Sequence, residues 1–403
     1  MSSPRNIVAF VGQNENGILR QYSHDLMALL APDGYIGHVI DLHTPDGLQK
    51  FNDLFPQGIA MAWGCAGVGS GLRHNDQILW DIIKIPFISV LADPPCWMPV
   101  HHFMPSRYVA NAYVFKEWLQ VQRRLVGSPQ YSAVLDAVGV PPNPHRDDIA
   151  WRDRSQRMAF IKTAGDPQTR RQKWANFPSR WRAILEDAAA SAIVCETGDI
   201  TDIFLAAYES HGLCPDHRKD ILFGLMCELD LYVREHRMTA FATALLDLPV
   251  DIYGRGWDHL AHKATRARFH PAFDAMTLNR VYADTQFILN TSPNIASNVH
   301  ERVASGLDSR CCVISDHNAF TRQHMADIPT FFGVDPNSPD LADQMAALYH
   351  SPTDYTEATR IGASYAARTF DGRAYMLAML KIAEEIKTAE HFHASIPKEL
   401  VFV

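Results

Sequence analysis

The sequence has no excess of basic residues. Its 403 residues contain 37 Lys and Arg against 45 Asp and Glu, which gives a formal charge of −8. Non-specific affinity for nucleic acid depends on many Lys and Arg contacts to phosphates, so this balance argues against a general polyanion binder. Any basic site must therefore be local.

Cysteine pairs with metal-like spacing and long apolar runs are also lacking. The seven cysteines are scattered, and the adjacent Cys311 and Cys312 lie in an apolar stretch, as expected of buried, reduced thiols in the cytosol. No apolar run approaches the ~18 residues that indicate a membrane span. The first residues, MSSPRNIVAFVGQNENG, are typical of a first strand rather than a signal peptide. We therefore expect a cytoplasmic protein.

The length and the apolar content, 47% of all residues, predict two or three well-buried domains. Apolar runs alternate with helical patterns over residues 7–91, which predicts a parallel, doubly wound sheet. The stiff segment 140–146 (VPPNPHR) is the best linker. We expect a first domain over residues 1–150 and a second over 151–403, the second with a helical insertion at about 169–246.

The most informative stretch is 286–316, QFILNTSPNIASNVHERVASGLDSRCCVISD. It predicts, in order, a buried strand at 287–291, a polar loop at 292–297, a helix at 299–309 and a second buried strand at 311–315. This is one turn of a parallel α/β sheet. Asn298 can cap the helix, and Glu301, three residues on, can reach back to close a capping box.

Such a helix begins at the carboxyl edge of the sheet, where its first amides and its dipole favour an anion. Arg302 in the first turn is unfavourable beside the positive helix end, by roughly 0.3–1 kcal/mol, unless something negative lies between them. A bound diphosphate would remove that conflict. An ordinary crossover with a surface arginine is the alternative interpretation.

Residues 151–182 form a local basic segment, with nine Lys or Arg and two Asp. A solvated helix face, a phosphate site and a surface for an anionic acceptor or a membrane all fit this composition. Lys162 is the notable member, because it ends the apolar run MAFIK just before a glycine turn and can reach a diphosphate there. The glycine loop at 64–71 lacks the spacing of a dinucleotide fingerprint, and a close approach of backbone or acceptor explains it equally well.

Several motifs together resemble the C-terminal domain of bacterial GT-B glycosyltransferases. They are Tyr253-Gly254-Arg255-Gly256-Trp257, FILN at 287–290, HERV at 300–303 and VISD at 313–316. The nearest group is the CgeB-like one with glycosyl-transferases-group-1 domains, and residues 80–95 resemble its first domain. The resemblance implies an α/β, GT-B fold, in which two Rossmann-like doubly wound domains face each other across a cleft. It also implies a last helix that crosses back to the first domain.

The resemblance implies a donor site whose residues bind a nucleotide-sugar. These are Lys162, Tyr253, Gly254, Gly256, Trp257, Asn290, Ser297, Asn298, Val299, His300, Glu301 and Arg302. Two positions depart from the family pattern. A second glutamate, counted from Glu301, falls on Ser309, and a glycine that usually precedes the final strand is Arg310. Retaining and inverting chemistry both stay open.

The implied activity is metal-independent transfer of a sugar from a nucleotide-diphosphate sugar to a glycan, lipid-linked or protein acceptor. It needs no cofactor beyond the donor and no nucleic acid, and a peripheral membrane contact is compatible with it. An inverting reaction needs a base, for which Asp93, with His101 and His102 behind it, is the candidate. A turn residue before Pro94 is the alternative role for Asp93. A sugar-nucleotide epimerase or hydrolase and a non-catalytic, two-lobed binding module are the competing functions.

Overall fold

A computed structural model of the chain describes residues 5–12, 16–102, 104–127, 131–392 and 399–402. The chain divides into two compact units, one formed by Met1–Pro141 with Phe370–Val403 and the other by Pro142–Thr369. The first unit thus ends before residue 150, where the sequence placed its boundary, and it includes the C-terminal segment.

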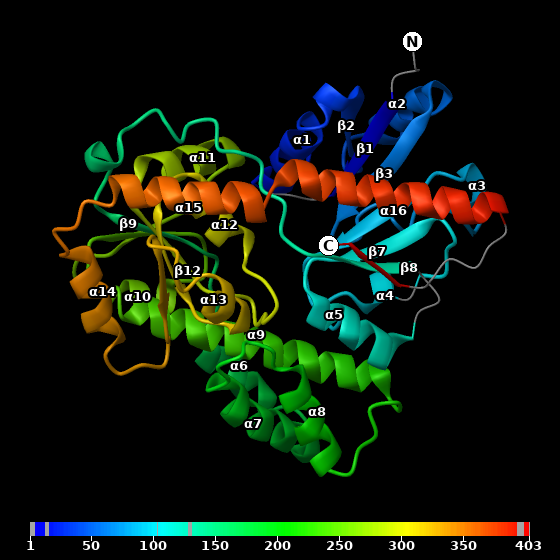
Figure 1. Cartoon of the computed structure of the whole chain (residues 1–403). Helices are drawn as coiled ribbons and strands as arrows, with labels where there is room; N and C mark the ends of the chain where they lie inside the picture. Colours follow the sequence, from blue (N-terminus) through cyan, green and yellow to red (C-terminus); the bar gives the residue numbers. More distant parts are fainter. Residues whose placement is uncertain (1–4, 13–15, 103, 128–130, 393–398, 403) are drawn as a thin grey trace. The chain divides into compact units, whose positions relative to one another are not determined.

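The first unit contains a seven-stranded parallel sheet in the order β15-β8-β7-β6-β3-β1-β2 (Figure 1). Its strands are β1 (Arg5–Val11), β2 (Tyr35–Asp41), β3 (Ile59–Cys65), β6 (Phe87–Leu91), β7 (Val109–Tyr113), β8 (Tyr131–Leu135) and β15 (Glu399–Phe402). The hairpin strands β4 (Arg73–His74) and β5 (Gln77–Ile78) pair separately. The helices are α1 (Ile18–Ala28), α2 (Gly47–Leu54), α3 (Leu79–Ile83), α4 (Pro99–His102), α5 (Lys116–Val121) and α16 (Gly372–Phe392).

An aromatic cluster forms the core on one face of this sheet. The ring of Phe10 on β1 lies 5.3 Å from that of Phe51 and 5.5 Å from that of Trp80, and Trp80 lies 4.7 Å from Phe87. Helix α16 packs against β3, β6 and β8. The alternation of apolar runs and helices in the sequence is thus expressed as a sheet with buried strands.

The second unit contains a six-stranded parallel sheet in the order β11-β10-β9-β12-β13-β14. Its strands are β9 (Met158–Ile161), β10 (Val250–Tyr253), β11 (Arg268–His270), β12 (Phe287–Asn290), β13 (Cys312–Asp316) and β14 (Phe331–Val334). This is the order of a doubly wound Rossmann fold, and it reverses between β9 and β12. The strand–helix–strand turn predicted for 286–316 is confirmed.

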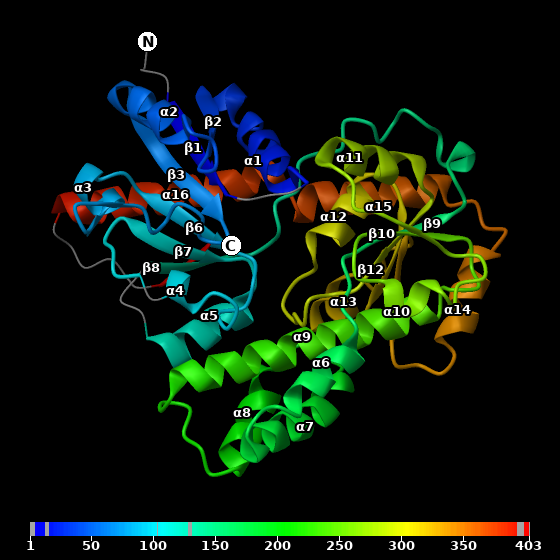
Figure 2. The same cartoon turned by 180° about the vertical axis from the view of Figure 1, so that it is seen from behind.

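Helices cover both faces of the second sheet (Figures 1 and 2). The helices of this unit are α6 (Pro167–Trp174), α7 (Ser179–Ile193), α8 (Thr201–Ser210), α9 (Lys219–Thr243), α10 (Asp258–Ala261), α11 (Ala275–Asp284), α12 (Glu301–Asp308), α13 (Ala319–His324), α14 (Leu341–Tyr349) and α15 (Thr356–Thr369). Of these, α6, α7 and α8 pack on α9 rather than on the sheet. Helix α9 packs its apolar side onto Phe160 and Leu289, while α11 lies on the opposite face beside Ala159 and Ile288. In the described part of the chain, no helix is both long and apolar enough to cross a membrane.

Candidate functional site

Lys162 lies where the strand order of the second sheet reverses. It follows β9 directly, and its Nζ donates a hydrogen bond of 3.0 Å to the main-chain oxygen of Thr291, the residue after β12. Open α/β sheets bind ligands outside the carboxyl ends of their strands at such a reversal. The structure therefore brings Lys162 to the loop that precedes α12.

Helix α12 begins at Glu301, and His300 is its N-cap residue. The predicted capping box between Asn298 and Glu301 is wrong. The side chain of Asn298 is buried and accepts instead from the amide of Val299, at 2.8 Å. The carbonyl of Asn298 accepts a 2.8 Å bond from Asn318 of the α13 cap, which holds this residue to a neighbouring loop. This tertiary contact delays the start of the helix.

His300, Glu301 and Arg302 form a compact polar group at the start of α12. His300 Nδ1 lies 2.7 Å from a Glu301 carboxylate oxygen, and Arg302 Nη1 lies 3.2 Å from His300 Nε2. Burial, offset in part by Glu301, lowers the pKa of His300 to about 4, so the imidazole is neutral at pH 7. A single proton on Nδ1, directed at Glu301, leaves Nε2 to accept from Arg302. The longer contact of 3.3 Å from the Arg302 amide to Nδ1 is then weak, and this amide stays a donor for a ligand.

The charges at this edge favour an anion. Burial, followed by the guanidinium groups of Arg302 and Arg234, lowers the pKa of Lys162 well below its usual value, and Asp316 and Glu301 oppose this effect. Burial acts to raise the pKa of Glu301, but His300 and Arg302 outweigh it and hold that pKa below its usual range. An anion among these cations would relieve their repulsion, as a phosphate does at a helix N-terminus.

The loop after β10 supports Lys162 from the other side. Gly254 has φ +139° and Gly256 has φ +82°, and an added Cβ would lie 2.2 Å from the oxygens of Lys162 and Ala164, respectively. Both glycines thus make room for the backbone that follows β9. Trp257 is buried in the core, and its Nε1 donates to the oxygen of Lys162 at 2.8 Å. Trp257, which the resemblance implied at the donor site, thus packs in the core of the unit.

Other residues of the expected donor site differ in their accessibility. The ring of Tyr253 is partly buried and stacks on His270, with 4.8 Å between centroids. Asn290 is fully buried, and its Nδ2 donates to Ser315 Oγ at 3.0 Å, so it supports β13. Val299 is buried and Ser297 is partly buried. Four of the expected donor-site residues can supply charge or acid–base chemistry: Lys162, His300, Glu301 and Arg302.

Both departures from the family pattern lie at the far end of α12. Ser309 is fully buried at the C-cap and accepts from Asn143 Nδ2 at 2.8 Å. Arg310 has φ +58°, the left-handed region where glycine is preferred after a helix, and it pairs with Asp147. An eight-residue helix is about 12 Å long, so neither position adjoins the N-terminal end. The departures therefore concern the anchoring of α12 rather than the Lys162 edge.

In the first unit, His102 is a core residue. Its ring is 1% exposed, and Nδ1 lies 2.7 Å from the hydroxyl of Tyr113. Burial, followed by the neighbouring His101, lowers its pKa to about 3. A side chain so enclosed has no access to a substrate, so His102 supports its surroundings.

His101 is placed differently, against the glycine loop that follows β3. Gly67 has φ +74°, and a Cβ there would lie 2.6 Å from the imidazole, so the absence of a side chain at this position makes room for the ring. Burial lowers the pKa of His101, which keeps it neutral at pH 7. Its Nδ1 lies 3.5 Å from Ser70 Oγ. Asp93, partly buried, follows β6 and precedes a turn closed by a 3.0 Å bond from the amide of Trp97 to the oxygen of Pro94.

The basic segment 151–182 does not present its charges together. Arg157 pairs with Asp251 at 2.9 Å and Arg170 with Glu235 at 2.6 Å, and Arg171 is bonded to Glu186. Trp151 and Trp174 are buried in the core. The paired arginines stabilise their own unit, and Lys162 stands apart at the sheet edge. Within the described residues, no group of three His, Cys, Asp or Glu side chains is arranged to hold a metal ion.

No protein-family model matches the sequence, and no curated protein does. Solved structures do match. An α-glucosyltransferase in complex with UDP-glucose and DNA containing an abasic site has a TM-score of 0.50 at 8% identity, over 94% of this chain and 99% of that one. Sucrose-phosphate synthase from Thermosynechococcus elongatus has a TM-score of 0.49 at 10% identity, over 96% and 100%. WaaG, a glycosyltransferase involved in lipopolysaccharide biosynthesis, has a TM-score of 0.49 at 10% identity, over 94% and 99%.

Such low identities show the fold alone. The α-glucosyltransferase match and the two parallel α/β sheets give this chain the fold of GT-B glycosyltransferases, which confirms the predicted fold class. The narrower resemblance to the CgeB-like group stays a prediction.

Proposed function

We propose that this protein is a glycosyltransferase that moves a sugar from a nucleotide-diphosphate sugar to an acceptor. One observation carries the proposal: the partly buried Lys162 lies at the strand-order reversal of the second sheet, bonded to the loop that enters α12. A lysine whose pKa is lowered by burial and by nearby arginines, at a ligand-binding edge, is typical of an anion site.

The chemistry follows from where charge develops. When the bond from sugar to diphosphate breaks, the leaving group gains negative charge, and donors already in place stabilise it without reorganisation. Lys162, Arg302 and the free amides of α12 supply that positive potential from the protein itself. The transfer is therefore proposed to be independent of metal.

The acceptor hydroxyl must lose a proton. Of Asp93, His101 and His102, we favour His101 as the base, because it is neutral, partly exposed and seated on the glycine loop, whereas His102 is enclosed. A proton on Nδ1 directed at Ser70 leaves Nε2 free to accept. Asp93 is the alternative base.

We propose that the acceptor is a glycan, a lipid-linked sugar or a protein. We also propose that the chain belongs to the CgeB-like group. A nucleic-acid acceptor is disfavoured by the overall charge of −8, and several arginines of the basic segment are held in internal ion pairs such as that of Arg157 with Asp251. We place the protein in the cytoplasm, where nucleotide-sugars are made, and a peripheral membrane contact remains compatible with this proposal.

The test is a thermal-shift and calorimetric screen of the full chain against UDP, GDP, ADP, CMP and dTDP, each alone and with its common sugars. A ligand at a hundred times its Kd adds about 2.7 kcal/mol, which shifts the melting midpoint by several degrees. The shift should shrink by half or more in Lys162→Met and persist in full in Lys173→Met, an exposed lysine of α6.

The products then separate the competing functions. Transfer of labelled sugar to an acceptor fraction supports the proposal. Release of free or epimerised sugar without an acceptor supports a hydrolase or an epimerase. Nucleotide binding without any turnover supports a binding module, and no binding by any nucleotide overturns the donor site.

A further inference from the structure

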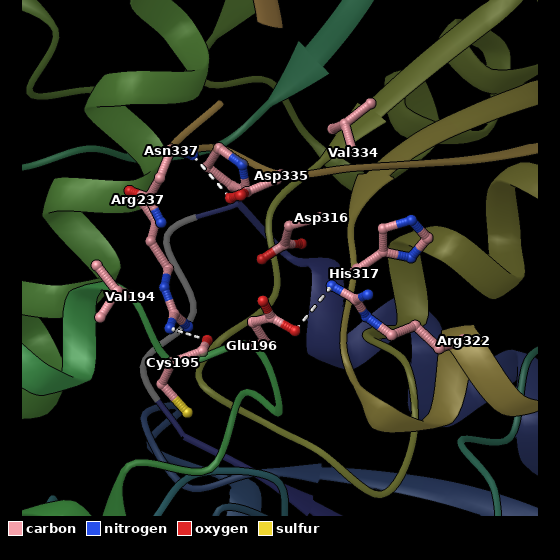
Figure 3. A pocket seen from close by; sticks show the side chains of 11 residues that line it. Val194, Cys195, Glu196, Arg237, Asp316, His317, Arg322, Val334, Asp335 and Asn337 are labelled. Atoms are coloured by element: carbon pink, nitrogen blue, oxygen red, sulfur yellow. Dashed lines mark hydrogen bonds and ion pairs between the residues drawn. The ribbon is translucent and has the colours of Figure 1, made fainter. Parts of the chain in front are cut away.

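A pocket opens in the second unit, beside the carboxyl ends of β13 and β14 (Figure 3). Its volume is about 200 Å³, and it is lined by Val194, Cys195, Glu196, Arg237, Asp316, His317, Arg322, Val334, Asp335, Pro336 and Asn337. Four of these come from the helical insertion: 194–196, after α7, and Arg237 of α9. Lys162, His300 and Arg302 are not part of its lining.

Two deeply buried and oppositely charged groups form the base of this pocket. Asp316 is 3% exposed, and one of its oxygens accepts from the amide of Ser292 at 2.7 Å and from Ser315 Oγ at 3.1 Å. Among the described residues, none donates a hydrogen bond to its second oxygen, and Figure 3 shows the carboxylate pointing into the pocket. This oxygen is a built-in acceptor for a ligand.

Arg237 is the matching donor. It is 6% exposed, and its Nη2 is held by the oxygens of Ala192 and Cys195, each at 2.9 Å, while Nη1 donates to Asn294 Oδ1 at 3.0 Å. These bonds lock the guanidinium in place but use only three of its five N–H groups. Arg237 is thus a rigid donor on the pocket wall.

The remaining charges exclude a simple ion. Glu196 and Asp335 add two carboxylates and Arg322 adds a second guanidinium, so an anion meets three acids and a cation meets two arginines. The contact from Arg322 to Glu196 is long, at 3.8 Å, and both side chains are exposed enough to turn to a ligand. A neutral hydroxyl both donates and accepts, so it can bond to an acid and a guanidinium at the same time.

We propose that this pocket binds one neutral sugar ring. Vicinal hydroxyls would pair with Asp316 and Arg237 at the base and with Glu196 and Arg322 at the mouth. Val194, which is 65% exposed, would cover an apolar face of the ring. The volume lies below the ~300–1,000 Å³ of sites for drug-sized ligands, and it fits a single ring rather than a whole nucleotide-sugar.

This sugar-binding proposal rests on the proposed function and adds a site for one of the sugars in the transfer reaction. The ring belongs either to the donor or to the acceptor, since both present the same hydroxyl chemistry. The test is a titration of the full chain with glucose, galactose, mannose and N-acetylglucosamine, followed by saturation-transfer NMR, with and without a nucleoside diphosphate. The variants are Glu196→Ala, Arg322→Ala and Asp316→Asn, with Glu357→Ala as the control, because Glu357 is as exposed as Glu196 and lies on α15.

We expect saturable binding of at least one sugar, weakened at least tenfold in Glu196→Ala and Arg322→Ala and unchanged in Glu357→Ala. These two exposed positions keep the test valid even where Asp316→Asn fails to fold. Absence of saturable binding, or equal binding by all variants, overturns the proposal.

Two further measurements show whether the ring belongs to the donor or to the acceptor. They also separate the proposed sugar site from the proposed glycosyltransferase function. If the ring is the donor's, Glu196→Ala weakens binding of a nucleotide-sugar but not of the free nucleotide. If the ring is the acceptor's, both affinities persist and the KM for acceptor rises. Lys162→Met must weaken nucleotide binding and leave sugar binding unchanged. Sugar binding by a protein that binds no nucleotide would uphold the pocket while the glycosyl-transfer proposal fails.

Discussion

Lys162 and Thr291 join the two strands between which the order of the second sheet reverses, through a 3.0 Å bond from Nζ to a main-chain oxygen. Each residue is the first after its strand, so the bond lies at the carboxyl edge of the sheet, at the reversal of strand order where such sheets bind ligands.

Lys162→Met should weaken nucleoside-diphosphate binding about 10- to 100-fold, since a hydrogen bond to a charged group contributes roughly 1.5–3 kcal/mol. The melting midpoint of the ligand-free protein should hold or rise, because the variant removes a desolvated charge. Calorimetry on this variant and on Lys173→Met provides the comparison. Equal affinities in the two variants would remove Lys162 from the site.

Diphosphate affinity should fall as pH rises, and it should do so at a lower pH than the ordinary lysine pKa of 10.5 would allow. The lowered pKa means that Lys162 loses its proton at a lower pH, and the neutral amine attracts an anion less. Binding should then be accompanied by proton uptake, which calorimetry in buffers of different ionisation enthalpy measures. The same experiment on Lys162→Met should show no such uptake in this range.

His300 should make the protein less stable in mild acid. The unfolded residue titrates near 6.5 and the folded one near 4, so between these values only the unfolded chain binds the proton, and stability falls as pH falls. His300→Gln should reduce the slope by at most ~1.4 kcal/mol per pH unit. Chemical denaturation at pH 6.5 and pH 5 measures this slope, and His24→Gln, at an exposed position of α1, should leave it unchanged.

Gly254→Ala should destabilise the second unit, because Gly254 has φ +139° and the new Cβ would lie 2.2 Å from the oxygen of Lys162. Gly224→Ala is a matched control on α9 with no atom within 4 Å of the new Cβ. The free energy of unfolding of the control should rise by about 0.5–1 kcal/mol, as is usual when alanine replaces glycine inside a helix. Melting midpoints that move in the same direction would contradict the geometry of the loop after β10.

His101→Asn should lower turnover by about 10²- to 10⁴-fold while nucleotide affinity stays unchanged, because a general base acts on the acceptor proton only. Asp93→Asn tests the alternative base in the same assay, and His24→Asn serves as the surface control. Full turnover in His101→Asn together with a loss in Asp93→Asn would transfer the role to Asp93.

Local patterns in the sequence were sufficient for much of the fold. Apolar runs of strand length alternate with helical segments, and the turn from β12 through α12 to β13 follows from them because each element is specified by neighbouring residues. Lys162 was found because it ends an apolar run before a glycine. β7, β8, β11 and β15 were missed because short strands between irregular segments carry little periodicity.

The composition of the site depended on contacts between distant residues. Asn318 holds Asn298 and so moves the start of α12 to Glu301, and Trp257 is drawn into the core by its bond to Lys162. The pocket beside β13 and β14 joins these strands to the α7–α9 insertion, whose lining residues lie about 80 or more positions earlier in the chain. The sequence by itself determined two α/β units and the strand–helix–strand turn at 286–316, since these depend on local periodicity. Only the tertiary structure decided the strand order, the burial of His102 and the convergence of Asp316 with Arg237, because long-range packing selects which polar groups meet.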